Sequence, residues 1–399
     1  MQSVQSTHAP VQREQRQSGL RPTSPAHHPA RPMDSAHQER PARKVLFLID
    51  NHAIRVQKTL AAVGDLYDIH VHADGGSALE AMYSHQPNVV LVDERTLRTQ
   101  GGGVHRTKCN DDRLKHIPFV IMSNGQDGPF LAGDGSGAID HFIKRPIKIN
   151  LLLDLIANSV SQQVEKSWKH LPKAASETLK TTSVHFGDIA KAVANNTPLD
   201  KSQVSASCNP LVACVRDNQH KDVLLGLRGH HNYTYVHSMR VAVFMAVFAQ
   251  AYNVSKDEQT LLTTGGYMHD VGKMSMPQSL LNKADELYDE DWDVIRDHVH
   301  HSSEIVAAIE DVNPIIQLIA DQHHERLDGT GYPNGLSGMQ INELGRMAAI
   351  ADVFAGLTDE RPYKHAYETD IAFQKMEQMG PVLDQRLLKL FRDAIQDGS

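Results

Sequence analysis

Three short apolar runs in the first half of the chain each end at a polar residue. They are Val45–Asp50, Asn88–Asp93 and Ile117–Ser123. Segments with helical spacing lie between them, and apolar strands that alternate with helices predict a parallel β-sheet with helices on both faces. In such sheets ligands bind outside the carboxyl ends of the strands. We therefore expect Asp50, Asp93 and Ser123 to meet at one edge.

The second half of the chain follows a different pattern. From about residue 222 the apolar spacing is helical almost throughout, without the alternation typical of strands. A chain of 399 residues is also too long for one ordinary hydrophobic core. The expected fold class is therefore two domains, a doubly wound α/β domain followed by an all-α helical bundle.

Five groups of histidine and aspartate recur along the predicted helices of the second half. They are His237, His269-Asp270, His298, His323-His324 and Asp352. Near His298 the sequence equally admits His300 or His301. Each group alone has an ordinary explanation as a packed or surface residue, but buried ionisable groups must be paired or bound to metal. Together they predict a metal centre, and Gly272 permits a turn that brings Lys273 over it.

Composition narrows the classes of function. A net charge of -8 gives no support to nucleic-acid binding, which usually needs a basic face. Three cysteines without CxxC spacing predict neither a disulfide framework nor a thiolate zinc site, and they fit a reducing cytosol. The longest apolar run, Val241–Ala249, is far shorter than the roughly 20 residues that span a bilayer. The N-terminus also lacks the apolar core of a signal peptide, so a cytoplasmic protein without a membrane span is expected.

Changes of composition divide the chain into four segments. Residues 1–42 are rich in Pro, Gln, Ser, His and Arg, and are expected to be a disordered tail because they cannot bury enough apolar surface. The start of translation, Met1 or Met33, stays open. The other predicted segments are an α/β domain at 43–158, a helical connector and start of the helical domain at 159–220, and the metal-dependent domain at 221–399. The apolar stripe of a connector helix at 150–169 fits either a homodimer or packing within one chain.

Residues 44 to about 158 resemble the receiver domain of two-component response regulators. The resemblance implies a flavodoxin-like fold, a phosphoacceptor at Asp93, an acidic site at Asp50 that holds Mg²⁺, and a cognate histidine kinase. Two positions depart from the family pattern. Asn51 halves the usual acid pair, and hard cations favour carboxylates; Arg145, in place of a lysine, directly precedes the proline after the fifth strand. A pseudo-receiver that serves only for docking is the alternative.

Residues from about 229 to 365 look like the HD-GYP family, the cyclic di-GMP phosphodiesterase branch of the HD superfamily. The motifs in family order are Tyr-Thr-x-x-His-Ser, His-Asp-x-Gly-Lys, His-His-Glu-Arg-x-Asp-Gly-x-Gly-Tyr-Pro and Arg-Pro-Tyr-Lys. The resemblance implies hydrolysis of cyclic di-GMP to pGpG and/or GMP through a dinuclear metal centre. It further implies regulation by the receiver-like domain in bacterial second-messenger signalling, and GGDEF-type partner proteins.

The resemblance also assigns roles to residues. The implied metal ligands are His237, His269, Asp270, His298, His323, His324 and Asp352. Asp270 is the expected bridge between two metal ions and acts in catalysis together with Lys273. Iron or manganese is expected, since imidazole and carboxylate ligands suit these metals. Some members hold a third ion through a Glu at the position of Tyr233, so two ions are expected here. The expected substrate-binding residues are Gly331, Tyr332, Arg361 and Lys364.

Two departures from the HD-GYP pattern concern the neighbours of the implied ligands. Ala355 stands where the family usually has an Asp, whose loss removes a partner that could tune metal affinity and activity. Ser302 replaces a usual Gly. These changes leave two alternatives open: a catalytically weakened module that binds cyclic di-GMP or docks a partner protein, and an enzyme for another cyclic dinucleotide.

Overall fold

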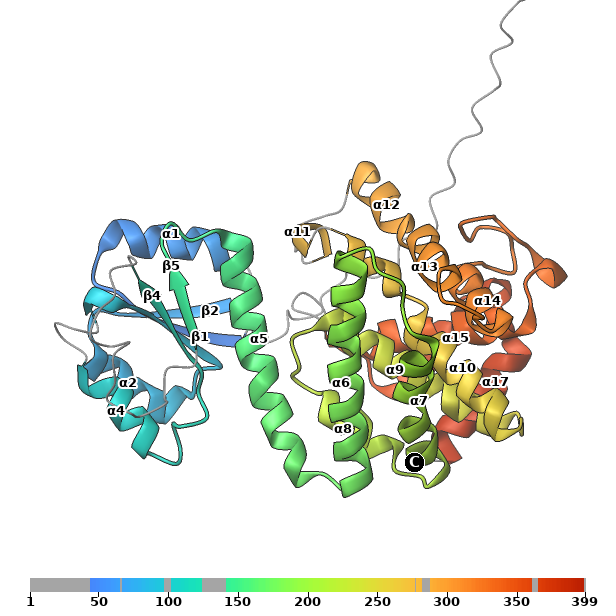
Figure 1. The fold of residues 1–399 in the computed structure, drawn as a ribbon, viewed down its shortest axis with the longest axis horizontal. Coiled ribbons are helices and arrows are strands. Elements are labelled where there is room, and N and C mark those ends of the chain that lie inside the picture. Colours follow the sequence, from blue (N-terminus) through green and yellow to red (C-terminus); the bar gives the residue numbers. More distant parts are fainter. Residues whose placement is uncertain are drawn as a thin grey trace, which may run out of the picture. The chain divides into compact units, whose positions relative to one another are not determined.

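The protein's structure is a computed structural model that describes residues 44–64, 67–96, 102–123, 141–276, 278–281, 288–360 and 365–397. The predicted disordered tail at 1–42 lies outside the described residues. The described residues form a parallel sheet with its helices and a larger all-helical part (Figure 1).

The sheet has five parallel strands in the order β2-β1-β3-β4-β5. Their bounds are β1 Lys44–Ile49, β2 Tyr67–His72, β3 Val89–Asp93, β4 Phe119–Ser123 and β5 His141–Lys144. This order reverses direction between β1 and β3, and ligands bind at such a switch point in doubly wound sheets. Asp50 follows β1 directly, and Asp93 is the last residue of β3. The two acids therefore lie at the switch point, as predicted for this fold.

Alternate residues of the central strands fill two cores on the two faces of the sheet. Leu46 and Leu48 of β1 belong to one core, and Phe47 and Ile49 belong to the other. Two helices contribute to the first core and two to the second (Figure 1). Their bounds are α1 Ala53–Val63 and α5 Ile149–Ser167 for the first, and α2 Gly75–His85 and α4 Gly102–Asn110 for the second. The predicted α/β doubly wound fold is confirmed.

Most of the remaining helices pack around one large hydrophobic core, to which α11 and α12 contribute no described residue. The bounds of the remaining helices are α6 Lys173–Ala194, α7 Lys201–Arg216, α8 His220–Leu227, α9 Tyr233–Ala251, α10 Lys256–Met268, α11 Gln278–Leu281, α12 Asp289–Arg296, α13 His298–Ala307, α14 Pro314–Gln322, α15 Glu343–Thr358, α16 Thr369–Gln378 and α17 Gln385–Asp397. α9 is buried along nearly all of its length after its first turn, which a helix apolar on every side requires. The predicted all-α second part is confirmed.

The helix α5 runs without interruption through the predicted boundary at 158. Leu152, Ile156 and Val160 of this helix belong to a core of the sheet. Trp168, directly after its end, is buried in the core of the helical part and donates its indole N–H to Gly226 O at 2.7 Å. The boundaries at 158 and 220 therefore stay predictions, since one helix contributes to both cores.

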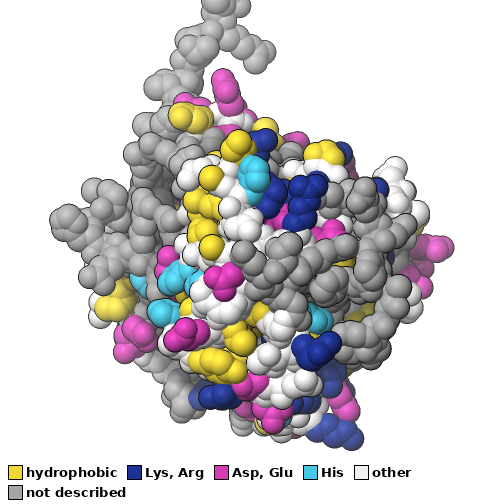
Figure 2. All heavy atoms as spheres, turned by 90° about the vertical axis from the view of Figure 1, so that its left-hand side faces the viewer, with side chains coloured by type: hydrophobic (Ala, Val, Ile, Leu, Met, Phe, Trp, Pro, Cys, Tyr) yellow, Lys and Arg dark blue, Asp and Glu magenta, His cyan; other side chains and the backbone are white. Residues whose placement is uncertain are grey.

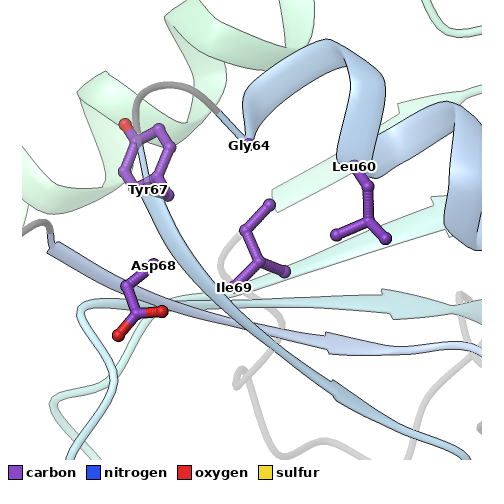
Figure 3. Close-up of a pocket in the computed structure, with 5 residues that line it drawn as sticks. All are labelled: Leu60, Gly64, Tyr67, Asp68 and Ile69. Carbon is purple, nitrogen blue, oxygen red and sulfur yellow. The ribbon is translucent and has the colours of Figure 1, made fainter.

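The described surface carries mixed charge. In Figure 2 acidic and basic side chains are interspersed on the visible described surface. A depression at the start of β2 is lined by Leu60, Gly64, Tyr67, Asp68 and Ile69 (Figure 3). It lies at the amino end of that strand, on the edge opposite Asp50 and Asp93, and its lining offers a single carboxylate.

Among the described helices, none combines the length and the apolar character that crossing a membrane requires.

Candidate metal centre

The seven predicted ligands come from five separate parts of the helical fold. His237 lies in the first turns of α9, and Asp352 lies in the middle of α15. His269 and His323 cap the carboxyl ends of α10 and α14, and His298 begins α13. Asp270 and His324 directly follow two of these histidines. The fold brings all seven side chains together, although they span more than a hundred positions of sequence.

A tight turn after Asp270 places this residue against α13. A Cβ atom at Gly272 would overlap the backbone of His298 and of Ser302, so only glycine fits there. The Gly272 N–H donates to Ser302 Oγ at 2.9 Å in a buried position. The serine that departs from the family pattern therefore holds the turn that carries Asp270.

Three histidine rings are oriented by the same local device. The Nδ1 atoms of His269, His298 and His323 lie 2.7, 2.5 and 2.9 Å from the carbonyl oxygens of the residues three positions earlier. A ring that donates its Nδ1 proton to a carbonyl keeps the lone pair on Nε2. The three Nε2 atoms lie 3.3, 3.0 and 3.8 Å from the Asp270 carboxylate. Metal-binding histidines are held in this way.

The candidate ligands form two groups that share Asp270. One group contains Asp270, His298, His323 and His324, and the other contains His237, His269 and Asp270. Within each group the ligand atoms lie within 4.8 Å of one another. Each group is compact enough for one cation, and the carboxylate that they share is placed to contact both.

Unpaired buried atoms show that the site fits a cation. Among the described residues, His269 Nε2 and Asp270 Oδ1 are buried without a hydrogen-bond partner of acceptable geometry. His298 Nε2 and His323 Nε2 lie 3.4 Å apart, and both are acceptors in the tautomer that their carbonyl contacts favour. Buried lone pairs that converge without a proton between them are stabilised by a bound metal ion.

His237 is held differently, between two carboxylates. Its Nε2 lies 3.0 Å from Asp352 Oδ1, and its Nδ1 lies 3.0 Å from Asp359 Oδ2. Burial alone would lower the pKa of His237, but the hydrogen bonds to these two acids outweigh it and raise this pKa to about 9. Arg240, one turn later on α9, pairs with Asp359 and donates to Thr358 Oγ1 at 2.7 Å. Asp359 is thus anchored by an arginine and orients a histidine.

The raised pKa of His237 favours its protonated ring, whereas four other candidate ligands have pKa shifts in the directions that metal binding requires. Burial lowers the pKa values of His323 and His324 well below the usual range, which keeps both rings neutral at pH 7. Burial opposes ionisation of Asp270 and Asp352, but neighbouring cations and hydrogen bonds outweigh it and hold both pKa values well below the usual range. Neutral imidazoles and ionised carboxylates are the forms that bind metal.

Comparison with known proteins identifies the segment that carries these residues. Residues 225–387 match the family model described as an HD domain. This segment belongs to the HD-domain family. The resemblance predicted from the motifs is confirmed at this level.

Curated relatives of the HD domain are named as phosphodiesterases. A cyclic di-GMP phosphodiesterase of Pseudomonas aeruginosa is 32% identical over 172 residues, which are 43% of this chain and 42% of that protein. A 3'3'-cGAMP-specific phosphodiesterase of Vibrio cholerae is 34% identical over 37% of this chain and 32% of its own length. The cyclic di-GMP phosphodiesterase response regulator RpfG of Xanthomonas campestris is 35% identical over 37% of this chain and 39% of its own length. The chain thus spans less than half the length of each of these relatives.

The Gly-Tyr-Pro loop of the HD domain folds back over the histidines. Glu325, 2% exposed, accepts hydrogen bonds from the backbone N–H groups of Asn334 and Leu336, both at 2.8 Å. A Cβ atom at Gly331 would overlap the backbone at Glu325, so the close approach that this glycine allows is to the chain itself. Tyr332 stacks on His324 with ring centroids 4.6 Å apart. The loop is therefore held to Glu325 through Asn334 and Leu336, and to the candidate ligand His324 through Tyr332.

The remaining predicted residues have different outcomes. Lys273 Nζ lies 2.5 Å from Asp270 Oδ2, so its ammonium group faces the shared carboxylate. His298 belongs to the cluster, whereas His300 is exposed and His301 pairs with Asp297. Arg361 and Lys364 lie outside the described residues.

One residue of the site was not predicted. Asp359 lies in a polar stretch after α15, and nothing in the spacing marks it as buried. It is nevertheless 2% exposed and contacts His237. Its environment arises from tertiary packing alone.

In the α/β part, the predicted phosphoacceptor Asp93 and the predicted acidic residue Asp50 are brought together with two arginines. Arg55 pairs with Asp50 at 2.6 Å and with Asp93 at 3.2 Å. Arg145 pairs with Asp93 at 3.0 Å and lies 3.8 Å from Asp50. This cluster is separate from the HD domain's histidines.

Proposed function

We propose that this chain is a metal-dependent phosphodiesterase that hydrolyses cyclic di-GMP to pGpG and/or GMP at the histidine–aspartate cluster of its HD domain. The observation that supports it most is the pair of ligand groups sharing Asp270, which together contain five histidines and this one aspartate. Asp352 lies 3.0 Å from His237 and 3.6 Å from His324. The names of the curated relatives support the class of substrate.

The residues would hold two divalent cations in distinct ways. One ion would be bound by His298, His323 and His324, the other by His237 and His269, with Asp270 shared and Asp352 within reach of His237 and His324. Iron or manganese is proposed, since imidazole and carboxylate ligands suit both. When bound, two such ions supply Lewis acidity that lowers the pKa of water and polarises a phosphodiester.

Two further side chains act on the substrate side of the cluster in this proposal. The ammonium group of Lys273, which faces Asp270, is placed to stabilise negative charge on a phosphoryl oxygen or on the leaving oxygen. The Tyr332 ring stacks on His324, and the Arg296 guanidinium lies 5.9 Å from the centroid of that tyrosine ring. These contacts hold the loop in one place, where its backbone can border the dinucleotide.

The test is turnover by the purified full-length protein, loaded with iron or manganese under reducing conditions, with products separated by chromatography. Wild type is expected to release pGpG or GMP. Asp270→Ala is expected to lose both bound metal and turnover, because both ligand groups contain Asp270. Lys273→Ala is expected to keep its metal and lose rate. His300→Ala is the matched control, since this exposed histidine neighbours the cluster without belonging to it.

Failure of wild type to release a linear product at any metal loading would refute the proposal. Tight calorimetric binding of cyclic di-GMP under those conditions would instead assign the chain to the binding modules. A parallel assay with 3'3'-cGAMP is warranted, because a relative that is 34% identical over 146 residues is named for that dinucleotide. Faster cleavage of 3'3'-cGAMP than of cyclic di-GMP would retain the phosphodiesterase and change its substrate.

A further inference from the structure

Asp50 and Asp93 form an acid pair at the carboxyl edge of the sheet. The charge of this acid pair is balanced by two arginines of the same chain, Arg55 and Arg145. Asp50 is 2% exposed, and both of its oxygens accept hydrogen bonds from Arg55, whose Nε and terminal nitrogen lie at 2.9 and 2.6 Å. Asp50 Oδ1, the oxygen that accepts from the terminal nitrogen of Arg55, also accepts the backbone N–H of His52 at 2.9 Å. The bidentate geometry is that of the stronger ion pairs in proteins.

Asp93 is engaged just as fully. Its Oδ1 accepts from Arg55 at 3.2 Å and from the backbone N–H of Arg95 at 3.1 Å. Its Oδ2 accepts from Arg145 at 3.0 Å. Two guanidinium charges therefore balance two buried carboxylates, and each of the four carboxylate oxygens lies within 3.2 Å of at least one donor.

These contacts do not fit a Mg²⁺ site. Mg²⁺ needs carboxylate oxygens that can turn toward it, with several waters in an octahedral shell. Here the oxygens face arginines, and the third position of the edge is the neutral amide of Asn51, which accepts a hydrogen bond from Thr96 at 3.5 Å. A divalent ion would add two positive charges where two guanidiniums already face the two carboxylates. It would have to displace Arg55 or Arg145, neither of which can deprotonate.

A second observation concerns the place where a phosphoryl group would lie. The Ser123 hydroxyl, at the end of β4, donates to Glu94 Oε2 at 2.6 Å. A carboxylate beside Asp93 therefore occupies this hydroxyl and adds negative charge at the edge that a phosphoryl dianion would approach. Like charges at such distances repel.

We propose that Arg55 and Arg145 permanently occupy the place of a metal ion beside Asp50 and Asp93. The receiver-like domain then neither binds Mg²⁺ at this acid pair nor accepts a phosphoryl group at Asp93. Arg145 takes the place of the lysine that a receiver would present before the proline, and Lys144 is exposed at the end of β5. Any regulation through this domain then works by binding rather than by phosphoryl transfer. The inference does not depend on the proposed phosphodiesterase activity.

The first experiment treats the wild-type chain with labelled acetyl phosphate and Mg²⁺. No acid-stable, hydroxylamine-sensitive label is expected on the protein. Hydrogen exchange of the segments around Asp50 and Asp93 is also expected to stay unchanged when Mg²⁺ or Mg²⁺ with beryllofluoride is added. Stoichiometric labelling at Asp93, or protection of both segments by Mg²⁺, would overturn the proposal.

The second experiment distinguishes the effect of a guanidinium on Mg²⁺ affinity from the effect of the acid that is missing at position 51. Asn51→Asp restores the acid pair, and Asn51→Asp/Arg55→Ala also removes one guanidinium. The double variant is expected to bind Mg²⁺ at least tenfold more tightly than Asn51→Asp, as read from exchange in the same two segments. Equal Mg²⁺ affinities would show that the guanidiniums do not prevent Mg²⁺ from binding at the acid pair. Because the HD domain is identical in both proteins, its own metal binding cancels in the comparison.

A matched control is Asn51→Asp/Arg113→Ala. Arg113 lies in the same domain and forms an ion pair with Asp111 at 3.1 Å, but its side chain is 69% exposed. Its removal is expected to leave Mg²⁺ affinity at the Asn51→Asp value. If the Arg55 variant does not fold, the labelling experiment on wild type still decides the proposal.

Discussion

Asp359 Oδ2 lies 3.0 Å from His237 Nδ1, although the two residues are 122 positions apart in the chain. Arg240 pairs with the same carboxylate. Ala355, at the position where the HD-GYP resemblance leads one to expect an aspartate, is fully buried in the hydrophobic core. A carboxylate that orients a candidate ligand is thus present in this chain, but it comes from the residue directly after α15 rather than from position 355 in the last turn of that helix.

Asp359→Asn is expected to weaken metal binding by about 10- to 100-fold, because loss of a carboxylate that orients a metal-binding histidine has effects of this size. The amide keeps the shape of the side chain, but Arg240 and His237 lose a buried carboxylate partner, so the melting temperature of the metal-free protein should fall as well. Titration with Mn²⁺ followed by paramagnetic resonance measures the affinity. Glu360→Gln, at the exposed next position, is the control. Wild-type affinity in Asp359→Asn would exclude the orienting role.

Ala355→Asp, which restores the residue expected from the resemblance, is expected to destabilise the protein rather than improve the site. Ala355 is 0% exposed within the hydrophobic core of the helical part. Burial of a carboxylate without a partner costs on the order of 3 kcal/mol or more. Urea unfolding of the metal-free protein measures the change, with Ala355→Val as a control for volume. A gain in metal affinity without loss of stability would contradict this expectation.

Glu325→Gln is expected to loosen the loop that carries Tyr332. The carboxylate accepts the backbone N–H groups of Asn334 and Leu336, and an amide offers one acceptor oxygen in place of two. One buried N–H then loses its partner, at a cost of about 1–3 kcal/mol. Faster hydrogen exchange of residues 334–336 is the direct readout. We expect KM for the dinucleotide to rise more than kcat falls, and unchanged exchange would remove the basis for this expectation.

Cys208 is expected to resist alkylation in the folded protein. Burial raises the pKa of its thiol from 9.0 to about 12, despite an opposing hydrogen bond from Thr264. The stabilising effect of the neutral thiol is complete below pH 9 and declines by about 1.4 kcal/mol per pH unit as the pH rises toward 12. Iodoacetamide at pH 8, read by mass spectrometry, should modify the half-buried Cys109 before Cys208. Rapid native labelling of Cys208 would contradict its burial.

The central strands of the sheet were predictable because they are buried on both faces. β1, β3 and β4 are continuous apolar runs, and the predicted runs overlap them closely. β5, His141–Lys144, has alternating burial and two polar residues, and α4, Gly102–Asn110, has little apolar periodicity. Neither was predicted from periodicity, because each gains its structure from neighbours rather than from its own pattern; a fifth strand before Pro146 was implied by the receiver resemblance alone.

The histidine and aspartate motifs determined which side chains could form a metal centre, since ionisable groups in apolar helices need partners. The sequence also determined the two classes of fold through its two periodicities. Only the tertiary structure decided that His298 rather than His300 or His301 joins the cluster, and that Asp359 supplies a carboxylate to His237. The tertiary structure also decided that Arg55 and Arg145 form the ion pairs with Asp50 and Asp93. Periodicity reports which face of an element is buried, but the partners of a buried charge depend on how distant elements pack.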